Sequence, residues 1–239
     1  MTHTKRVAAA LAGLLALSSP AFAHVGVDHA SSFSAGLAHP FGGLDHVTAM
    51  VAVGLWAVLK GGRALWVWPA AFVGVMLLGS ALGMAGIALP FVEVGILASV
   101  VLLGLMVTLA VDAPTVAGAA AVAVFALLHG HVHGSEVTEN MSGFGYMMGF
   151  ALATATLHLA GIGFALAMAR LAWRPAIHLA GALCVGIGAS LFAGAALAYD
   201  TSPAAHAYHS TSLLPGAEIS LVALLILAGT LAFARLKRS

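Results

Sequence analysis

The stretch TVAGAAAVAVFALLHGHVHGSE, residues 115–136, joins an uncharged apolar run to three histidines and a glutamate. An apolar run approaching 20 residues is long enough to cross a bilayer as a helix. We therefore predict a membrane-spanning helix over residues 115–131. The polar residues that follow are nitrogen and oxygen donors of the kind that bind transition metals. This stretch predicts a membrane protein that handles a metal ion.

The whole chain has the composition that such a helix requires. Hydrophobic residues make up 62% of it and charged residues 7%, with a mean hydropathy of +1.06. Soluble proteins carry roughly 45–50% apolar and about 25% charged residues. Lipid is therefore the expected surrounding of most side chains. A net charge of +1 without a basic patch excludes nucleic acid as a partner.

Interruptions by glycine, proline and charged residues divide the chain into seven predicted spans. We expect an all-α bundle of about seven helices and a single domain over residues 24–239, with no soluble domain. Paired small residues at Gly79/Gly83 and Gly145/Gly149 predict close helix–helix approach. The predicted spans are residues 43–59, 65–88, 91–111, 115–131, 143–170, 176–199 and 217–235.

The first 23 residues are predicted to be a cleavable signal peptide. They carry two basic residues, Lys5 and Arg6, near their start, continue with an apolar stretch too short to span, and end on Ala-Phe-Ala. Cleavage would leave a free amine on His24. That amine and its imidazole form a weaker candidate metal site.

The basic residues orient the predicted helices. All of them after residue 23 fall in segments that seven crossings place on one side. The positive-inside rule makes that side cytoplasmic. We therefore predict a protein of a bacterial inner membrane, with a periplasmic mature N-terminus and a cytoplasmic C-terminus. At an inner helix end, Asp112 precedes Pro114 and is expected to cap the fourth helix.

The first candidate metal cluster lies at the outer mouth of the first span. Pro40 and a glycine pair separate His39 from Asp45 and His46, and a bend there would fold His39 back toward the other two. Two imidazoles and one carboxylate suit nickel, cobalt or zinc. Met50, one turn further along, is expected to be packing.

The second cluster contains His129, His131, His133 and Glu136. On a helix, His129, His133 and Glu136 would share a face and His131 would point elsewhere. The neighbouring glycines make an unwound segment an equal alternative. Both clusters are expected on the outer side, where they form either one site or two successive ones.

Two further polar residues are weaker candidates for an ion path. His158 falls midway along the predicted span 143–170, where a neutral imidazole requires a partner or a wet passage. Either an ion path or a helix–helix hydrogen bond would account for it. Glu93, at an outer helix end, either joins that path or extends its carboxylate to the membrane surface.

At these residues the chain resembles the HupE/UreJ family. The marks of that family are His-x5-Asp-His, here His39 to His46, and His-Gly-x-x-His-Gly-x-Glu, here His129 to Glu136. The resemblance extends over nearly the whole mature chain. It implies a secondary permease for Ni²⁺, and perhaps Co²⁺, that serves hydrogenase or urease maturation. It also implies that His39, Asp45, His46, His129, His133 and Glu136 take part in metal passage.

We therefore expect a permease and not an enzyme, with Ni²⁺ or Co²⁺ as the cargo and no prosthetic group. No P-loop motif is present, so facilitated diffusion is favoured. One alternative is an intramembrane zinc-dependent hydrolase built on Asp45, His46 and His129. A membrane cytochrome is a second alternative, although His158 lacks an obvious partner at its depth.

Overall fold

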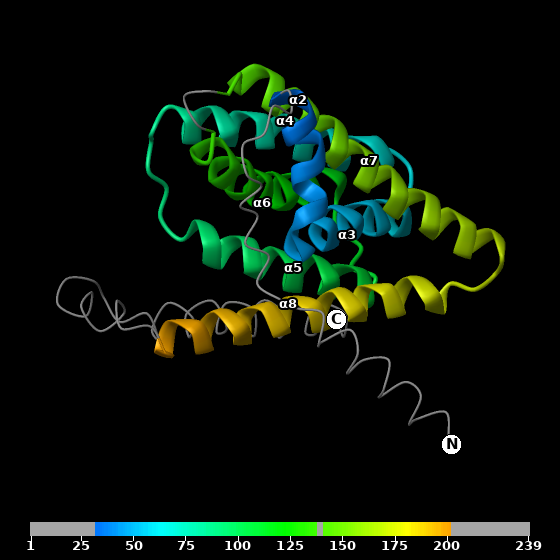
Figure 1. Cartoon of the computed structure of the whole chain (residues 1–239). Coiled ribbons are helices and arrows are strands. Elements are labelled where there is room, and N and C mark those ends of the chain that lie inside the picture. The colour runs from blue at the N-terminus through cyan, green and yellow to red at the C-terminus, as the bar shows by residue number, and fades with distance from the viewer. Residues whose placement is uncertain (1–31, 138–140, 202–239) are drawn as a thin grey trace.

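A computed structural model describes residues 32–137 and 141–201. Helices and their connections account for this part of the chain, which contains no strand (Figure 1). The elements are α2 (Ser32–Ala38), η1 (His39–Gly42), α3 (Leu44–Lys60), α4 (Ala64–Met84), α5 (Val92–Thr108), α6 (Thr115–Ser135), α7 (Gly143–Arg170) and α8 (Pro175–Thr201).

Six of the seven predicted spans coincide with helices. Four of them, α4, α6, α7 and the first part of α8, are long and apolar enough to cross a membrane. A bent pair made of residues 32–42 and α3 counts as a fifth, and α5 is apolar but shorter. The predicted span 217–235 and the predicted signal peptide lie outside the described residues. The chain is thus an all-helical membrane-type protein, and the number seven stays a prediction.

The segment before α3 contains helices that no predicted span includes. Residues 32–42 are helical and meet α3 at an angle of 82°. Helix α2 packs closely on α7, where Gly36 faces the Tyr146 carbonyl and Gly149 faces the Phe33 carbonyl with no room for a Cβ. Seven residues are too few to show as a span, so the sequence pattern missed α2.

Glycines also bring α4 and α6 into backbone contact. A Cβ on Gly79 or Gly83 would overlap the backbone of α6, and one on Gly130 or Gly134 would overlap the backbone of α4. The Ser80 hydroxyl donates a hydrogen bond to the Gly130 carbonyl at 2.8 Å across this interface. The predicted close approach at Gly79/Gly83 is confirmed. It fixes α6, and hence the second histidine cluster, on α4.

The far end of the bundle, where α3 ends and α4 and α6 begin, is closed by aromatic packing. The buried indoles of Trp56 and Trp68 lie 4.2 Å apart, and they donate hydrogen bonds to the carbonyls of Val111 and Thr115. Asp112 forms an ion pair with Lys60 at 2.5 Å. The prediction that Asp112 caps α6 is wrong, because Pro114 holds the N-cap position without a side-chain cap.

Candidate metal site

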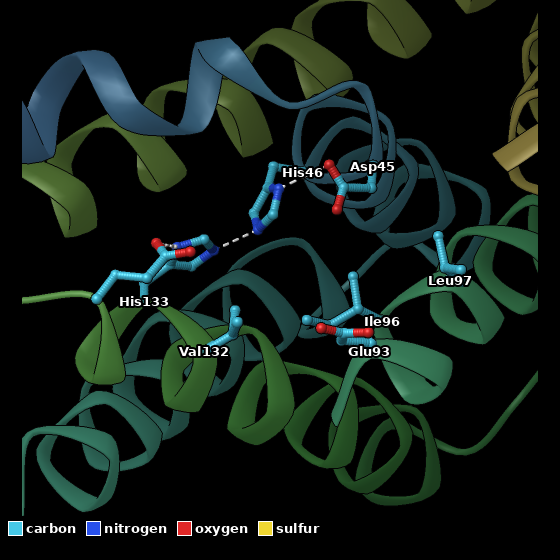
Figure 2. Close-up of a pocket in the computed structure, with 8 residues that line it drawn as sticks. Asp45, His46, Glu93, Ile96, Leu97, Val132 and His133 are labelled. Atoms are coloured by element: carbon cyan, nitrogen blue, oxygen red, sulfur yellow. Dashed lines mark hydrogen bonds and ion pairs between the residues drawn. The ribbon is translucent and has the colours of Figure 1, made fainter. Parts of the chain in front are cut away.

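The two predicted clusters converge at one end of the bundle. The start of α3 carries Asp45 and His46, and the end of α6 carries His129, His133 and Glu136. Helix α6 continues to Ser135, so the helical alternative for the second cluster is confirmed. Figure 2 shows His46 pointing from α3 toward His133 of α6. We call the converging side chains the donor cluster: His39, Asp45, His46, His129, His133 and Glu136.

The centre of the donor cluster is a pair of facing imidazoles. The Nε2 atoms of His46 and His133 are in direct contact. The other nitrogen of each ring is hydrogen-bonded to a carboxylate: His46 Nδ1 donates to Asp45 Oδ1 at 2.8 Å, and His133 Nδ1 donates to Glu136 Oε2 at 3.0 Å. A carboxylate that accepts the Nδ1 hydrogen leaves the Nε2 lone pair free, as in the second shell of metal sites. Two such lone pairs facing each other require a proton or a metal ion between them.

Local backbone geometry makes this arrangement possible at Asp45 and His46. A Cβ on Gly43, the residue before α3, would lie 2.6 Å from Asp45 Oδ1 and 2.7 Å from His46 Nδ1. Only glycine therefore lets the carboxylate and the ring pair beneath the chain as it enters the helix.

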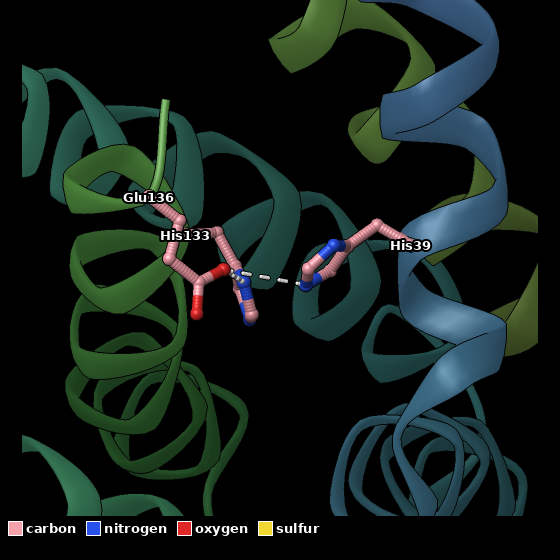
Figure 3. Close-up of side chains that lie close together, drawn as sticks. All are labelled: His39, His133 and Glu136. Carbon is pink, nitrogen blue, oxygen red and sulfur yellow. Dashed lines mark hydrogen bonds and ion pairs between the residues drawn. The ribbon is translucent and has the colours of Figure 1, made fainter. Parts of the chain in front are cut away.

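His39 completes an outer group of donors, shown in Figure 3. The 82° bend brings its ring to 4.6 Å from the His133 ring, and its Nε2 lies 3.4 Å from Glu136 Oε2. Donor atoms of His39, His133 and Glu136 all lie within 4.8 Å of one another, close enough to hold one ion. His133 belongs both to this outer group and to the facing pair, so the two predicted clusters form one continuous series of donors.

His129 extends the donor cluster one turn deeper along α6. Its side chain is fully buried, and its ring lies 5.2 Å from that of His46. Its Nδ1 donates to the Phe125 carbonyl at 2.9 Å, whereas its buried Nε2 has no hydrogen-bond partner among the described residues. Because Nδ1 carries the hydrogen, Nε2 presents a lone pair. An unsatisfied buried acceptor is rare in proteins, and this one is available as a ligand atom.

A pocket of about 300 Å³ lies against the donor cluster. Glu93, exposed at the start of α5, faces the donor cluster across it (Figure 2). Asp45, Glu93 and Glu136 give the pocket three carboxylates, and no Lys or Arg lines it. Such a charge pattern attracts cations. The lining residues are Asp45, His46, Glu93, Ile96, Leu97, Val132, His133 and Glu136.

Aromatic side chains that the sequence analysis did not single out form the wall behind the donor cluster. Phe150, fully buried on α7, lies 4.7 Å from the His133 ring and 6.0 Å from that of His39. Tyr146, one turn earlier, lies 5.9 Å from the His39 ring. The sequence shows that Tyr146 and Phe150 are one turn apart on a predicted helix. It does not show that they pack against His39 and His133.

The remaining candidates lie elsewhere. His131 points away from the donor cluster, and its Nε2 donates to the Ile87 carbonyl at 2.6 Å. His158 is fully buried on α7, with neither ring nitrogen hydrogen-bonded to a described residue. The alternative of a helix–helix hydrogen bond for His158 is therefore not realised in the structure. His24 lies outside the described residues, and Met50 is fully buried packing, as expected.

Comparison with known proteins agrees with this donor set. The sequence model of the HupE / UreJ protein family matches residues 12–191. The chain belongs to the HupE/UreJ family. Protein HupE of Rhizobium leguminosarum bv. viciae is 49% identical to it over 180 residues, which cover 75% of the chain and 94% of that relative. No solved structure matches the chain.

The extent of the HupE/UreJ match corrects one expectation. The resemblance was expected to run over nearly the whole mature chain, but the match ends at residue 191, within α8. The donor cluster, Glu93 and His158 all lie inside it. The predicted span 217–235 lies beyond it, so family membership gives that segment no support.

Proposed function

We propose that this HupE/UreJ protein is a permease that carries a divalent transition-metal ion, Ni²⁺ first and Co²⁺ second, into the cytoplasm for metalloenzyme maturation. The observation that carries the proposal is the meeting of His39, His46, His133 and Glu136 from three separate elements. Four donors of this kind, gathered where an apolar bundle opens into an acidic pocket, fit capture of a divalent cation from water.

The distribution of charge supports the direction of transport. Within the described residues, every Lys and Arg lies at the end of the bundle opposite the donor cluster. They are Lys60, Arg63, Arg170 and Arg174. The positive-inside rule makes that end cytoplasmic and leaves the donor cluster periplasmic. The ion would enter through the acidic pocket and leave past the basic end.

The membrane potential is a sufficient driving force. An inside-negative potential favours entry of a cation by about 2.3 kcal/mol per elementary charge per 100 mV, and roughly twice that for a divalent ion. Consumption of the metal by cytoplasmic enzymes would maintain the concentration gradient. Facilitated diffusion is therefore our favoured mechanism. The family match lends no support to the alternative of a zinc-dependent hydrolase.

Uptake of radioactive nickel into cells or proteoliposomes tests the proposal directly. We expect uptake by the native protein and loss to background for His133→Ala, because His133 belongs to both donor groups. His131→Ala is the matched control, since His131 lies two residues away on α6 but faces the Ile87 carbonyl. We expect it to retain uptake within about twofold.

Competition by unlabelled Co²⁺ and Zn²⁺ in the same assay gives the selectivity, which imidazole and carboxylate ligands do not set by affinity order alone. We expect Co²⁺ to compete and Zn²⁺ to compete less. Absence of uptake of all three metals by an inserted native protein would end the proposal. Equal uptake by His133→Ala and the native protein would remove the site assignment.

A further inference from the structure

His158 is an imidazole buried at membrane depth, outside the donor cluster. It lies fifteen residues after Gly143, the first residue of α7. At a rise of 1.5 Å per residue this is about 22 Å along the helix, well inside a hydrocarbon core of about 30 Å. Phe150, which packs against the His133 ring, lies eight residues before His158 on α7. His158 therefore lies about 12 Å further along α7 than the level of His133.

Both nitrogens of the His158 ring are buried and lack a partner among the described residues. A neutral imidazole has one donor and one acceptor, and leaving a buried polar group unsatisfied costs about 1–3 kcal/mol. Within the part of the chain that the structure describes, its one ring contact is with Phe72, at 5.1 Å in an edge arrangement. Hydrogen bonding within the described residues therefore does not account for this costly polar group in the interior.

Phe72 connects this imidazole to the donor cluster. The same ring lies 5.7 Å from the His129 ring, and His129 Nε2 is itself buried and unpartnered. Thr154, one turn before His158 on α7, donates from its hydroxyl to the sulfur of Met76, one turn after Phe72 on α4, at 3.5 Å. His129, with its unpartnered Nε2, and His158, with two unpartnered nitrogens, thus contact one aromatic ring, one turn from a hydroxyl and a thioether.

We propose that His158 is a second, inner binding station for the transported divalent metal, which the ion reaches from His129 past the Phe72 ring. This deepens the proposed function and rests on it. An ion that leaves the donor cluster needs a new ligand before it can cross the apolar interior. Conduction through several sites requires each to bind favourably but weakly enough to release the ion. One imidazole with a nearby hydroxyl and thioether is a weaker donor set than the four ligands at the mouth.

The test compares uptake with equilibrium binding in the full-length protein. His158→Leu keeps a similar volume and removes both nitrogens. In proteoliposomes we expect Ni²⁺ uptake at least about tenfold below native. In detergent we expect Ni²⁺ affinity at the donor cluster within about twofold of native. His178→Leu is the matched control: His178 is a half-buried imidazole on α8 whose Nδ1 donates to the Thr108 carbonyl at 3.1 Å. We expect its uptake to be unchanged.

A second variant separates a ligand from a packing residue. His158→Cys replaces the imidazole by a softer thiolate donor, and thiolates favour zinc over nickel. We expect measurable uptake and a Zn²⁺-to-Ni²⁺ preference at least about fivefold above native. A purely structural role would not move that preference.

The outcomes separate this inference from the proposed function. Native uptake that His158→Leu leaves intact would overturn the inner station alone, as would an unchanged metal preference in His158→Cys. No uptake by the native protein would overturn the permease itself.

Discussion

The two ends of the bundle treat buried polar groups in opposite ways. At the far end, the indole nitrogens of the buried Trp56 and Trp68 donate to backbone carbonyls, and Lys60 pairs with Asp112 at the surface. At the end with the donor cluster, His129 keeps an unpartnered buried nitrogen, and the His46 and His133 rings turn their lone pairs toward each other. The far end is arranged for stability, whereas the donor cluster gives up stability to keep ligands available.

Trp68→Ala should give the largest change in stability and leave metal binding intact. The side chain is fully buried, and truncating a buried aromatic typically costs about 3–5 kcal/mol. We expect the free energy of unfolding in detergent, measured by heat or denaturant, to fall by this amount. The Ni²⁺ affinity of the folded protein should stay near native. Trp66→Ala is the control, because Trp66 is 63% exposed and should cost under about 0.5 kcal/mol. A large loss of Ni²⁺ affinity in Trp68→Ala would break the division between the two ends.

Asp45→Asn should show the reverse pattern, with weaker metal binding and little loss of fold. The Asp45 carboxylate orients the His46 ring and holds the hydrogen on Nδ1, so that Nε2 presents its lone pair. Loss of such a partner typically costs 10- to 100-fold in metal affinity, roughly 1.4–2.7 kcal/mol. Isothermal titration with Ni²⁺ would measure it. Asp112→Asn, at the far end, is the carboxylate control and should bind Ni²⁺ as the native protein does.

His129→Leu should sharpen the comparison by improving stability while lowering uptake. In the metal-free native protein, the unsatisfied buried nitrogen lowers the free energy of unfolding by about 1–3 kcal/mol. The substitution removes this nitrogen and its cost. We expect a higher melting temperature without metal and a smaller rise on adding Ni²⁺, because ligand binding to the native state stabilises it. A lower melting temperature in the metal-free variant would contradict this account of His129.

Lys60→Met should have the smallest effect. The ion pair with Asp112 is short, but the Asp112 side chain is 81% exposed, and exposed pairs contribute about 0–1 kcal/mol. We expect the free energy of unfolding and the Ni²⁺ affinity both to be close to those of the native protein. A loss above about 2 kcal/mol would show that this contact contributes more to closing the far end than an exposed ion pair does.

Much of the fold was readable because membrane helices follow local hydrophobicity. The span 143–170 matches α7 at both ends, and the i, i+4, i+7 spacing placed His129, His133 and Glu136 on one face with His131 elsewhere. Spacing says nothing about which helices face each other, however. The meeting of His46 with His133 and the aromatic wall of Phe150 required the structure. Helix α2 was missed because seven residues carry too little pattern.

The glycine contacts between α4 and α6 have a mechanical consequence for any transport cycle. Backbones packed without intervening side chains leave no clearance for sliding or tilting. The two helices therefore form one rigid unit, which carries His129, His133 and Phe72 together. Glycines pack α2 and α3 on α7 in the same way, through Gly36 and Gly149 for α2 and through Gly54 and Gly161 for α3. A rearrangement that releases an ion would then separate two rigid units, one carrying His129 and His133 and the other joined to His46 on α3.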